Sequence, residues 1–407
     1  MADPHLLITY PFPLGRATGG ARMTREIARY LGRAGARVTV LPVSVALGRA
    51  WFPRPRLEAQ FEGREYDEEL AADGVRIRRV PRHPLHWGLD ARNVRRAVAE
   101  ILDAEPVDAV LSYYNEAAFL PDLLQRRGVL FGFVSTWQSY EHALSVDLPG
   151  VPAALHDRVV RRLVIEPHRR ADLLLATSEF TRGELVEFVG VARERIHLCP
   201  LGVRPEFLRI PREATGRVSR LLFFGRIIPA KGALDVIRAV RVLADRGIAG
   251  FRVRFRGQGD HEWARAAARE HGVADRVEVL GPAGDEELLA ELAEAQLAVM
   301  PSHFEAFGLV FAEAQAAGLP VVAYDAGSVP EVVADGESGW LAPVHDVAGL
   351  ADRIAAALAD PAETWRRGLA GRERVQRLFT WQATAATILG KIEGIRTAAA
   401  AGSGPGR

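Results

Sequence analysis

Short apolar runs alternate with amphipathic segments along almost the whole chain, and this alternation constrains the fold more than any other feature. Segment 21–35, ARMTREIARYLGRAG, places Met23, Ile27 and Leu31 on one helical face. Strands that alternate with helices favour a parallel sheet covered on both faces. The sequence therefore predicts an α/β fold with doubly wound, Rossmann-like sheets. The strands expected in the first half are HLLITY, ARVTVLPV, VRIRRV, VDAVLSY, GVLFGFVS, DLLLATS and RIHLCP.

The alternation stops at 201–217, LGVRPEFLRIPREATGR, and then resumes. This stretch has two prolines, two glycines and no clean period, which is typical of a linker. The second series of expected strands is RLLFFG, FRVRFRG, RVEVLG, LAVMPS, LPVVAYD and GWLAP. Because 407 residues are too many for one ordinary core, we predict two domains with an active site in the cleft between them. The predicted boundaries are an N-terminal Rossmann-like domain over 1–200, a linker over 201–217, a C-terminal Rossmann-like domain over 218–378, a terminal helix over 379–397 and a disordered tail over 398–407.

Composition argues against several classes of protein. Hydrophobic residues make up 48% and charged residues 25%, as in soluble globular proteins, and the net charge of +1 argues against nucleic-acid binding. The single cysteine, Cys199, excludes an internal disulfide framework and fits a reducing compartment. No apolar run reaches about 20 residues and no basic segment precedes the first run, so we expect neither a membrane span nor a signal peptide. The expected location is cytoplasmic, with peripheral contact at the inner face of the membrane left open.

Two cations lie in the loop between an expected strand, RLLFF, and the helix that follows it. Arg226 and Lys231 stand in FFGRIIPAKG, and Gly232 opens the helix. Cations beside a helix N-terminus are suited to a diphosphate, although two solvated surface cations are the alternative. Of the 52 basic residues only Lys231 and Lys391 are lysines, which favours a specific use for the compact ammonium group of Lys231.

Two acids flank a glycine turn in the stretch HFEAFGLVFAEAQAAGLP. Glu305 precedes a helix expected to start near Gly308 or Leu309, and Glu313 lies inside it, about 12 Å away at about 1.5 Å per residue. Each carboxylate can accept hydrogen bonds from two neighbouring hydroxyls, which suits a ligand with a sugar at one end and a ribose at the other. Helix capping is the alternative for Glu305, but it explains Glu313 poorly because the neighbours of Glu313 indicate a buried helix.

Several motifs together resemble the retaining glycosyltransferases of family 4. The resemblance is carried first by 298–342, AVMPSHFEAFGLVFAEAQAAGLPVVAYDAGSVPEVVADGESGWLA. FFGRIIPAKG, RGQGD, TSEFTRGEL, LCPLGVRPEFL, an early pair of glycines and the final FTW helix agree with it, so the resemblance covers the whole chain. It implies a GT-B fold, in which two Rossmann-like domains face a cleft and a C-terminal helix crosses back onto the first domain.

The resemblance also implies a nucleotide-diphosphate sugar donor, held mainly by the C-terminal domain. By position, Arg226 and Lys231 would neutralise the diphosphate. Glu305 would hold hydroxyls of the donor sugar, and these three are the implied catalytic residues. The remaining implied donor-binding residues are Glu313 at the ribose, the backbones of Phe307, Gly308 and Leu309 around the sugar and phosphates, and Gly20 where the first domain approaches the diphosphate.

The implied reaction moves a hexosyl group to a hydroxyl of a glycan, glycolipid or small molecule, with retention of the anomeric configuration. It would need cations at the leaving diphosphate, but no carboxylate nucleophile, cofactor or bound metal. The sequence has no Asp-x-Asp motif and no histidine or cysteine cluster with ligand spacing. UDP is the expected nucleotide, ahead of GDP.

Other functions are compatible with parts of this pattern. A non-catalytic sugar-nucleotide-binding GT-B protein would keep the same fold, and a nucleotide-sugar epimerase would convert the donor without transfer. A dinucleotide oxidoreductase is excluded because no expected strand is followed by G-x-G-x-x-G.

Candidate residues for binding the acceptor lie in the N-terminal domain. Trp137, Tyr140 and His142 are candidates, although each could equally be a packing or exposed residue. The segments expected to build this side are 11–20, 45–65, 82–88 and 136–148.

Two small residues stand within the motifs that carry the resemblance. Ala306 stands where the family usually has glycine or serine, and Ser328 where a second glycine is common. The basic amphipathic segment 156–170, HDRVVRRLVIEPHRR, could meet anionic lipid, although a solvated helix face is the alternative.

Overall fold

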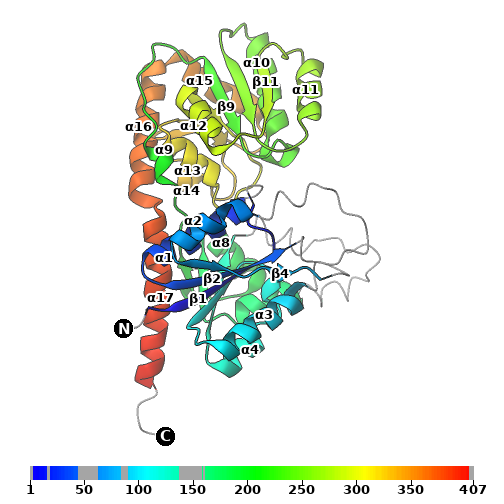
Figure 1. Ribbon diagram of the computed structural model, residues 1–407. Helices are drawn as coiled ribbons and strands as arrows, with labels where there is room; N and C mark the ends of the chain where they lie inside the picture. The colour runs from blue at the N-terminus through cyan, green and yellow to red at the C-terminus, as the bar shows by residue number, and fades with distance from the viewer. Residues whose placement is uncertain are drawn as a thin grey trace. The chain divides into compact units, whose positions relative to one another are not determined.

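The structure is a computed structural model that describes residues 3–15, 19–44, 63–83, 90–136, 158 and 161–402. The chain divides into two compact units, whose helices and strands are drawn in Figure 1. Unit 1 contains Met1–Pro200 together with Trp381–Arg407, and unit 2 contains Leu201–Thr380. Each unit has helices packed on a parallel sheet, so the predicted α/β fold with doubly wound sheets is confirmed.

Unit 1 is built on a parallel sheet in the order β3-β2-β1-β5-β6-β7-β8, with β4 also paired to β2. Its central strand β1 is buried along its whole length, as expected for a strand covered by helices on both faces. The strand order reverses between β1 and β5, and ligands of open α/β sheets bind beyond the carboxyl ends of strands at such a reversal. The strands are β1 (His5–Tyr10), β2 (Arg37–Ser44), β3 (Val75–Ile77), β4 (Val80–Pro81), β5 (Ala109–Ser112), β6 (Leu130–Ser135), β7 (Leu173–Ala176) and β8 (Ile196–Leu198).

The helices of unit 1 follow the predicted alternation. The α-helices of its described part are α1 (Gly19–Arg33), α2 (Asp67–Ala72), α3 (Asp90–Ala104), α4 (Pro121–Arg127), α7 (Glu166–Arg169), α8 (Glu179–Glu184) and α17 (Trp381–Gly402). Short 3₁₀ turns lie at Arg64–Tyr66, Asn115–Ala117 and Arg193–Arg195, and π-helical turns at Arg161–Ile165 and Leu185–Val189.

Unit 2 has a second parallel sheet, in the order β11-β10-β9-β12-β13-β14, which reverses between β9 and β12. The strands are β9 (Arg220–Phe224), β10 (Arg252–Arg256), β11 (Val277–Gly281), β12 (Leu297–Val299), β13 (Val321–Tyr324) and β14 (Gly339–Ala342). The helices are α9 (Pro205–Leu208), α10 (Ala233–Asp245), α11 (His261–Glu270), α12 (Asp285–Glu294), α13 (Leu309–Ala316), α14 (Val329–Val332), α15 (Val347–Ala359) and α16 (Pro361–Leu378), with a 3₁₀ turn at Pro229–Lys231.

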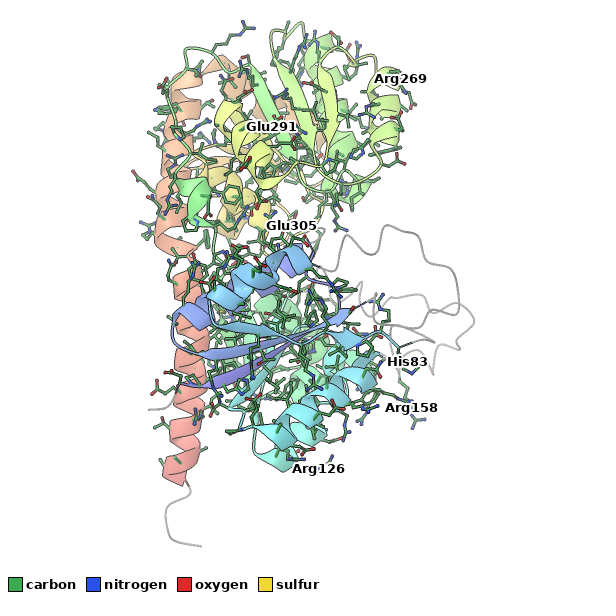
Figure 2. The ribbon with its side chains drawn as sticks, viewed as in Figure 1. His83, Arg126, Arg158, Arg269, Glu291 and Glu305 are labelled. Atoms are coloured by element: carbon green, nitrogen blue, oxygen red, sulfur yellow. The ribbon has the colours of Figure 1, made fainter. Side chains whose placement is uncertain are left out.

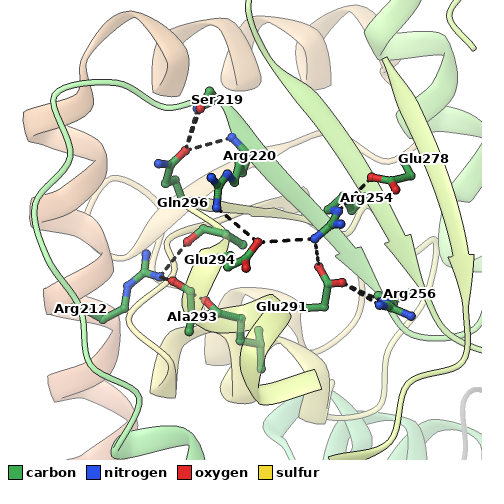
Figure 3. Close-up of polar contacts among 12 residues, drawn as sticks. Arg212, Ser219, Arg220, Arg254, Arg256, Glu278, Glu291, Ala293, Glu294 and Gln296 are labelled. Atoms are coloured by element: carbon green, nitrogen blue, oxygen red, sulfur yellow. Dashed lines mark hydrogen bonds and ion pairs between the residues drawn. The ribbon is translucent and has the colours of Figure 1, made fainter. Parts of the chain in front are cut away.

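Buried ion pairs hold helix α12 against the sheet of unit 2. Glu291, labelled in Figure 2, is 6% exposed and accepts hydrogen bonds from Arg254 at 2.9 Å and from Arg256 at 2.8 Å. Both arginines belong to β10, and their charges compensate the burial of the carboxylate. Figure 3 shows this cluster between strand and helix.

Arg212 fixes the segment predicted as a linker to unit 2. Its guanidinium donates to the carbonyl oxygens of Leu292, Ala293 and Ala295 at the C-terminal end of α12, at 3.1, 3.1 and 2.7 Å (Figure 3). Burial lowers the pKa of Arg212 to about 10. Segment 201–217 also contains helix α9, so it is a folded part of unit 2.

After α16 the chain returns to unit 1 through the long helix α17. Trp381, at its start, is 1% exposed, and the Thr384 hydroxyl donates to Pro200 O at 2.7 Å. Helix α17 packs against α1. It extends to Gly402, so the predicted disordered tail over 398–407 begins too early, because residues 398–401 are alanines, the strongest helix formers.

Candidate functional site

The loop that follows β9 is paired with the loop that follows β10. The Gly225 N–H donates to Arg256 O at 2.9 Å, and the Ile227 N–H donates to Gln258 O at 2.7 Å. These bonds continue the contact between the two neighbouring strands beyond their carboxyl ends. The backbone on both sides of Arg226 is therefore held in place.

Two glycines of the RGQGD motif make this pairing possible. A Cβ atom on Gly257 would lie 1.6 Å from Gly225 O, and one on Gly259 would lie 2.2 Å from Ile227 O. Their φ angles of 148° and 145° are also open to glycine far more readily than to other residues. Close approach of two backbones thus explains the motif.

The turn that carries Lys231 is packed against the loop after β12. Lys231 ends the 3₁₀ turn Pro229–Lys231, and Gly232 then adopts φ 74° before α10 begins. A Cβ atom on Gly232 would lie 2.0 Å from Pro301 O, and the His303 N–H donates to Ala230 O at 3.1 Å. The two loops that flank the strand-order reversal of unit 2 therefore touch through their backbones.

Lys231 and Glu305 form an ion pair across these two loops. The Lys231 Nζ donates to Glu305 Oε1 at 2.8 Å and lies 3.5 Å from Phe304 O. The side chains are only 15% and 10% exposed. Glu305 is labelled in Figure 2, on the loop that follows β12. The sequence predicts that the two groups contact different parts of a ligand, and in the structure their side chains bind each other.

The backbone of Glu305 is fixed by the loop that follows β13. The Ser328 N–H and hydroxyl both donate to Glu305 O, at 3.0 and 3.2 Å, and Ser328 is fully buried. A Cβ atom on Gly327 would lie 2.3 Å from the same oxygen. Serine at 328, where the family often has glycine, therefore adds a hydrogen bond that positions Glu305.

The glycine turn leads directly into helix α13. Gly308 has φ 83°, and helix Leu309–Ala316 starts with the Phe311 N–H donating to Gly308 O at 3.0 Å. Phe307 is 5% exposed, and its ring packs edge-on against Phe379 with centroids 5.4 Å apart. The turn formed by Phe307, Gly308 and Leu309, whose backbones are predicted to contact the donor, is thus held by its own packing.

The two remaining predicted side chains of unit 2 differ in exposure. Glu313 is 2% exposed inside α13, between buried neighbours such as Ala312 and Ala314, so the expectation of a buried helix is confirmed. Arg226 is exposed, and its guanidinium has no ion-pair partner among the described residues. It can therefore reach a ligand without breaking an existing ion pair.

The predicted residues of unit 1 are only partly described. Gly20 lies in the first turn of α1, and a Cβ atom there would lie 2.7 Å from the Tyr10 hydroxyl oxygen. A larger residue at this position would have to displace the Tyr10 hydroxyl, which favours glycine here. Trp137, Tyr140 and His142 lie outside the described residues.

Sequence reasoning missed a buried acid at the strand-order reversal of unit 1. Glu116 accepts hydrogen bonds from the N–H groups of Tyr113 and Tyr114 at 2.9 and 3.0 Å, and from the Thr9 hydroxyl at 3.1 Å. Burial raises the pKa of Glu116 to about 7. The signal was a polar NEA after the strand VLSY. A shallow hollow here is lined by Pro11, Phe12, Arg82, Asp90, Ala91, Asn115 and Glu116.

One group of side chains in unit 2 has the composition of a metal site. Asp235, His303 and His345 each offer one ligand atom, and these atoms lie within 4.8 Å of one another. Sequence reasoning missed the group because its members come from three distant segments.

In the described part of the basic segment 156–170, which the sequence suggested as a possible contact with lipid, Arg170 pairs with Asp122 at 2.5 Å and His168 is buried.

In the described part of the chain, no helix combines the length and the apolar character that a membrane span needs. Peripheral contact with lipid stays a prediction.

The sequence and the fold both match known proteins. Residues 18–202 match the family described as "Glycosyl transferase 4-like domain", and residues 209–374 match "Glycosyl transferases group 1". The chain is similar to a glycogen synthase of Mycobacterium tuberculosis (strain CDC 1551 / Oshkosh), with 37% identity over 229 residues, 55% of this chain and 54% of that protein. The chain thus spans about half the length of this relative.

Two further comparisons extend over most of the chain. A GDP-mannose-dependent alpha-(1-6)-phosphatidylinositol monomannoside mannosyltransferase of Mycolicibacterium smegmatis is 29% identical over 352 residues, 82% of this chain and 88% of that protein. The solved structure of a sucrose-phosphate synthase from Thermosynechococcus elongatus aligns with a TM-score of 0.76 and 21% identity, covering 97% of this chain and 100% of that chain.

Proposed function

Because this chain belongs to the glycosyl transferases group 1 and has the GT-B fold, we propose that it is a retaining glycosyltransferase. Its donor is a nucleoside-diphosphate hexose, and its acceptor is a hydroxyl group of a glycan, a glycolipid or a small molecule. UDP is the expected nucleotide from the sequence. GDP is the second candidate, since the relative aligned over 82% of this chain is named GDP-mannose-dependent.

The ion pair between Lys231 and Glu305 is the observation that carries this proposal. Its two loops follow β9 and β12, the strands between which the sheet order of unit 2 reverses, and open α/β sheets bind ligands at that point. A sugar diphosphate offers each member of the pair a better partner. A phosphate oxygen would take the ammonium group of Lys231, and sugar hydroxyls would donate to the carboxylate of Glu305.

The proposed chemistry follows from the charge of the leaving group. The bond between sugar C1 and the diphosphate breaks, and its electron pair departs with the nucleoside diphosphate. Lys231 and the exposed Arg226 stabilise the charge that develops there. The acceptor oxygen bonds to C1 on the face that the diphosphate leaves, and the acceptor proton passes to a departing phosphate oxygen. This sequence retains the anomeric configuration and needs neither a metal nor a cofactor in the chemical step.

The acceptor is proposed to bind to unit 1. The hollow beside Glu116 lies at the strand-order reversal of that unit and offers the guanidinium of Arg82 and the amide of Asn115 to hydroxyl groups. Trp137, Tyr140 and His142 remain predictions for the same role. A lipid-linked acceptor would bring the protein to the inner membrane surface from the cytoplasm.

A donor panel tests the function. Purified protein is mixed with UDP-glucose, UDP-galactose, UDP-N-acetylglucosamine, GDP-mannose and GDP-fucose, in buffer with a chelator, and the melting temperature and the release of free nucleotide are measured. We expect one donor class to raise the melting temperature and to be hydrolysed slowly without acceptor. A protein that neither shifts with nor releases nucleotide from any of these donors would not have the proposed function.

The second lysine of the sequence, Lys391, provides a matched control for this experiment. Lys231→Ala should remove most of the donor-induced shift and lower nucleotide release about 100-fold. Lys391→Ala changes the other lysine, on helix α17 of unit 1, and should behave like the wild type. Equal donor shifts in both variants would show that Lys231 does not contact the diphosphate.

A further inference from the structure

Three side chains from separate segments of unit 2 converge beside the ion pair described above. Asp235 lies in the first turn of α10, His303 in the loop after β12, and His345 in the turn after β14. The His303 Nε2 lies 2.8 Å from Asp235 Oδ2, and the rings of His303 and His345 meet edge-on with centroids 4.3 Å apart. One carboxylate oxygen and two imidazole nitrogens thus lie within 4.8 Å of one another.

The backbone of His345 is in an unfavourable conformation for a residue with a side chain. Its φ of 68° is the only positive value among the described residues other than glycine. Glycine would adopt this angle without steric cost, and a strained residue of this kind often lies at a functional position. The turn itself needs no imidazole, since the cap of α15 is made by Asp346, whose Oδ1 accepts from the Gly349 N–H at 2.8 Å. The imidazole of His345 therefore needs a separate explanation.

Asp235 is held with one oxygen directed at the two histidines. The residue is 5% exposed, and the Tyr324 hydroxyl donates to Oδ2 at 3.3 Å. Such an outer hydrogen bond orients a carboxylate that binds a metal. The Arg238 guanidinium lies 3.7 Å from the other oxygen, Oδ1, so its charge acts on the far side of the carboxylate. His345 is exposed, which gives an ion access to the group from solvent.

We propose that Asp235, His303 and His345 bind one divalent transition-metal ion, with zinc as the best fit, and that water completes its coordination. Two imidazole nitrogens and one carboxylate oxygen suit zinc, whereas calcium and magnesium prefer oxygen ligands alone. Tetrahedral ligands about 2.0–2.1 Å from zinc are roughly 3.3 Å apart. The 2.8 Å contact of His303 with Asp235 opens by about half an ångström, and His345 closes in.

Metal binding at this point would stiffen the loop that carries Glu305. His303 precedes Glu305 by two residues, and its N–H already donates to Ala230 O, next to Lys231. The ion would therefore fasten α10, the loop after β12 and the turn after β14 to one another. This role is structural, and it is independent of the proposed transfer reaction, which needs no metal.

Calorimetric titration of the chelator-treated, full-length protein with Zn²⁺ tests the proposal, and metal analysis after dialysis gives the stoichiometry. The variants are His303→Ala, His345→Gly and Asp235→Asn, with His271→Ala, at the end of α11 outside the group, as the matched control. We expect one zinc per chain in the wild type and in the control, and at least 100-fold weaker binding in each of the three variants. Unchanged binding in the three variants, or no binding by the wild type, would overturn the proposal.

Melting temperatures separate loss of the site from loss of folding. His345→Gly relieves the strain of the positive φ angle, so without zinc it should melt at or above the wild-type temperature, while zinc should stabilise the wild type but not this variant. A zinc-induced rise of equal size in His345→Gly would contradict the proposal. No donor is present in these measurements, and the donor panel is run with a chelator, so the two proposals fail independently.

Discussion

The ammonium group of Lys231 and the carboxylate of Glu305 bind each other at 2.8 Å, although they lie on loops 74 residues apart in sequence. Because both side chains are largely buried, each charge compensates for the burial of the other. In the proposed function a donor would separate them, and the new contacts with phosphate and sugar would compensate for this loss. The ion pair would therefore hold both groups near the positions proposed for donor binding.

Replacing Glu305 with Gln should separate the chemical step from donor binding. The amide keeps the size of the side chain, but it cannot accept sugar hydroxyls with both of its terminal atoms. We expect kcat to fall about 100-fold, while the KM for the donor changes less than about threefold, because Lys231 is freed to bind phosphate. Steady-state kinetics with varied donor measure both constants. A rise in KM with unchanged kcat would place Glu305 in ground-state binding only.

Replacing Arg226 with Ala should impair transfer without affecting stability. The side chain is exposed and has no ion-pair partner in the described part of the chain, so the free energy of unfolding should change by less than about 0.5 kcal/mol. Loss of a cation at the leaving diphosphate should lower kcat/KM by about 10- to 100-fold. Chemical denaturation and initial rates on the same preparation provide the comparison. Full activity in this variant would remove Arg226 from the site.

Alanine at Gly257 should destabilise unit 2 far more than alanine at Gly247. Both glycines have positive φ, 148° and 74°. A Cβ atom would meet Gly225 O at 1.6 Å in the first case and no atom within 4 Å in the second. We expect a loss of about 3 kcal/mol or more for Gly257→Ala and about 1 kcal/mol for Gly247→Ala. Urea denaturation measures both, and similar losses would mean that the paired loops can yield.

The pH dependence of stability should reveal Glu116. Burial raises the pKa of Glu116 from 4.5 to about 7, while the unfolded chain keeps the ordinary value. Between these values the unfolded state releases its proton first, so the contribution of this group to stability is complete below pH 4.5 and is lost as the pH rises to about 7. The difference between the two pKa values corresponds to a free energy on the order of 3 kcal/mol.

The variant Glu116→Gln removes this titration and isolates its effect. Between pH 5 and pH 8, the free energy of unfolding of this variant should rise relative to that of the wild type by on the order of 2–3 kcal/mol. Denaturation curves of both proteins across this range give the difference. Two parallel pH profiles would mean that Glu116 is charged in the folded protein at pH 5.

The periodicity of apolar residues and the positions of glycines were sufficient to predict the order of the helices and strands and the turn that leads into α13. Apolar runs such as RLLFF indicate a strand that is buried on both faces, and Gly308 indicates a positive φ angle just before the helix. These patterns depend only on residues close together in the sequence, so they can be interpreted without knowledge of the fold. They also located Glu313 correctly on a buried helix.

Contacts between distant segments could not be predicted in this way. Nothing near His345 in sequence indicates His303 as its neighbour, and nothing near Lys231 indicates that Glu305 neutralises it. Strand order decides both contacts, because it brings the loops after β9, β12 and β14 to the same edge of the sheet. The role of Gly20 shows the same limit, since its close neighbour, Tyr10, lies on the preceding strand.

The division of unit 1 into two stretches of chain has a consequence for biosynthesis. Residues 1–200 leave the ribosome before unit 2, but α17, which packs against α1 and buries Trp381, is translated after unit 2. Until then the nascent first stretch exposes the apolar surface that α17 will cover, while unit 2 is contiguous and can fold as soon as it emerges. A stop codon shortly before Trp381 would thus leave unit 1 without α17, although the rest of that unit is encoded upstream of unit 2.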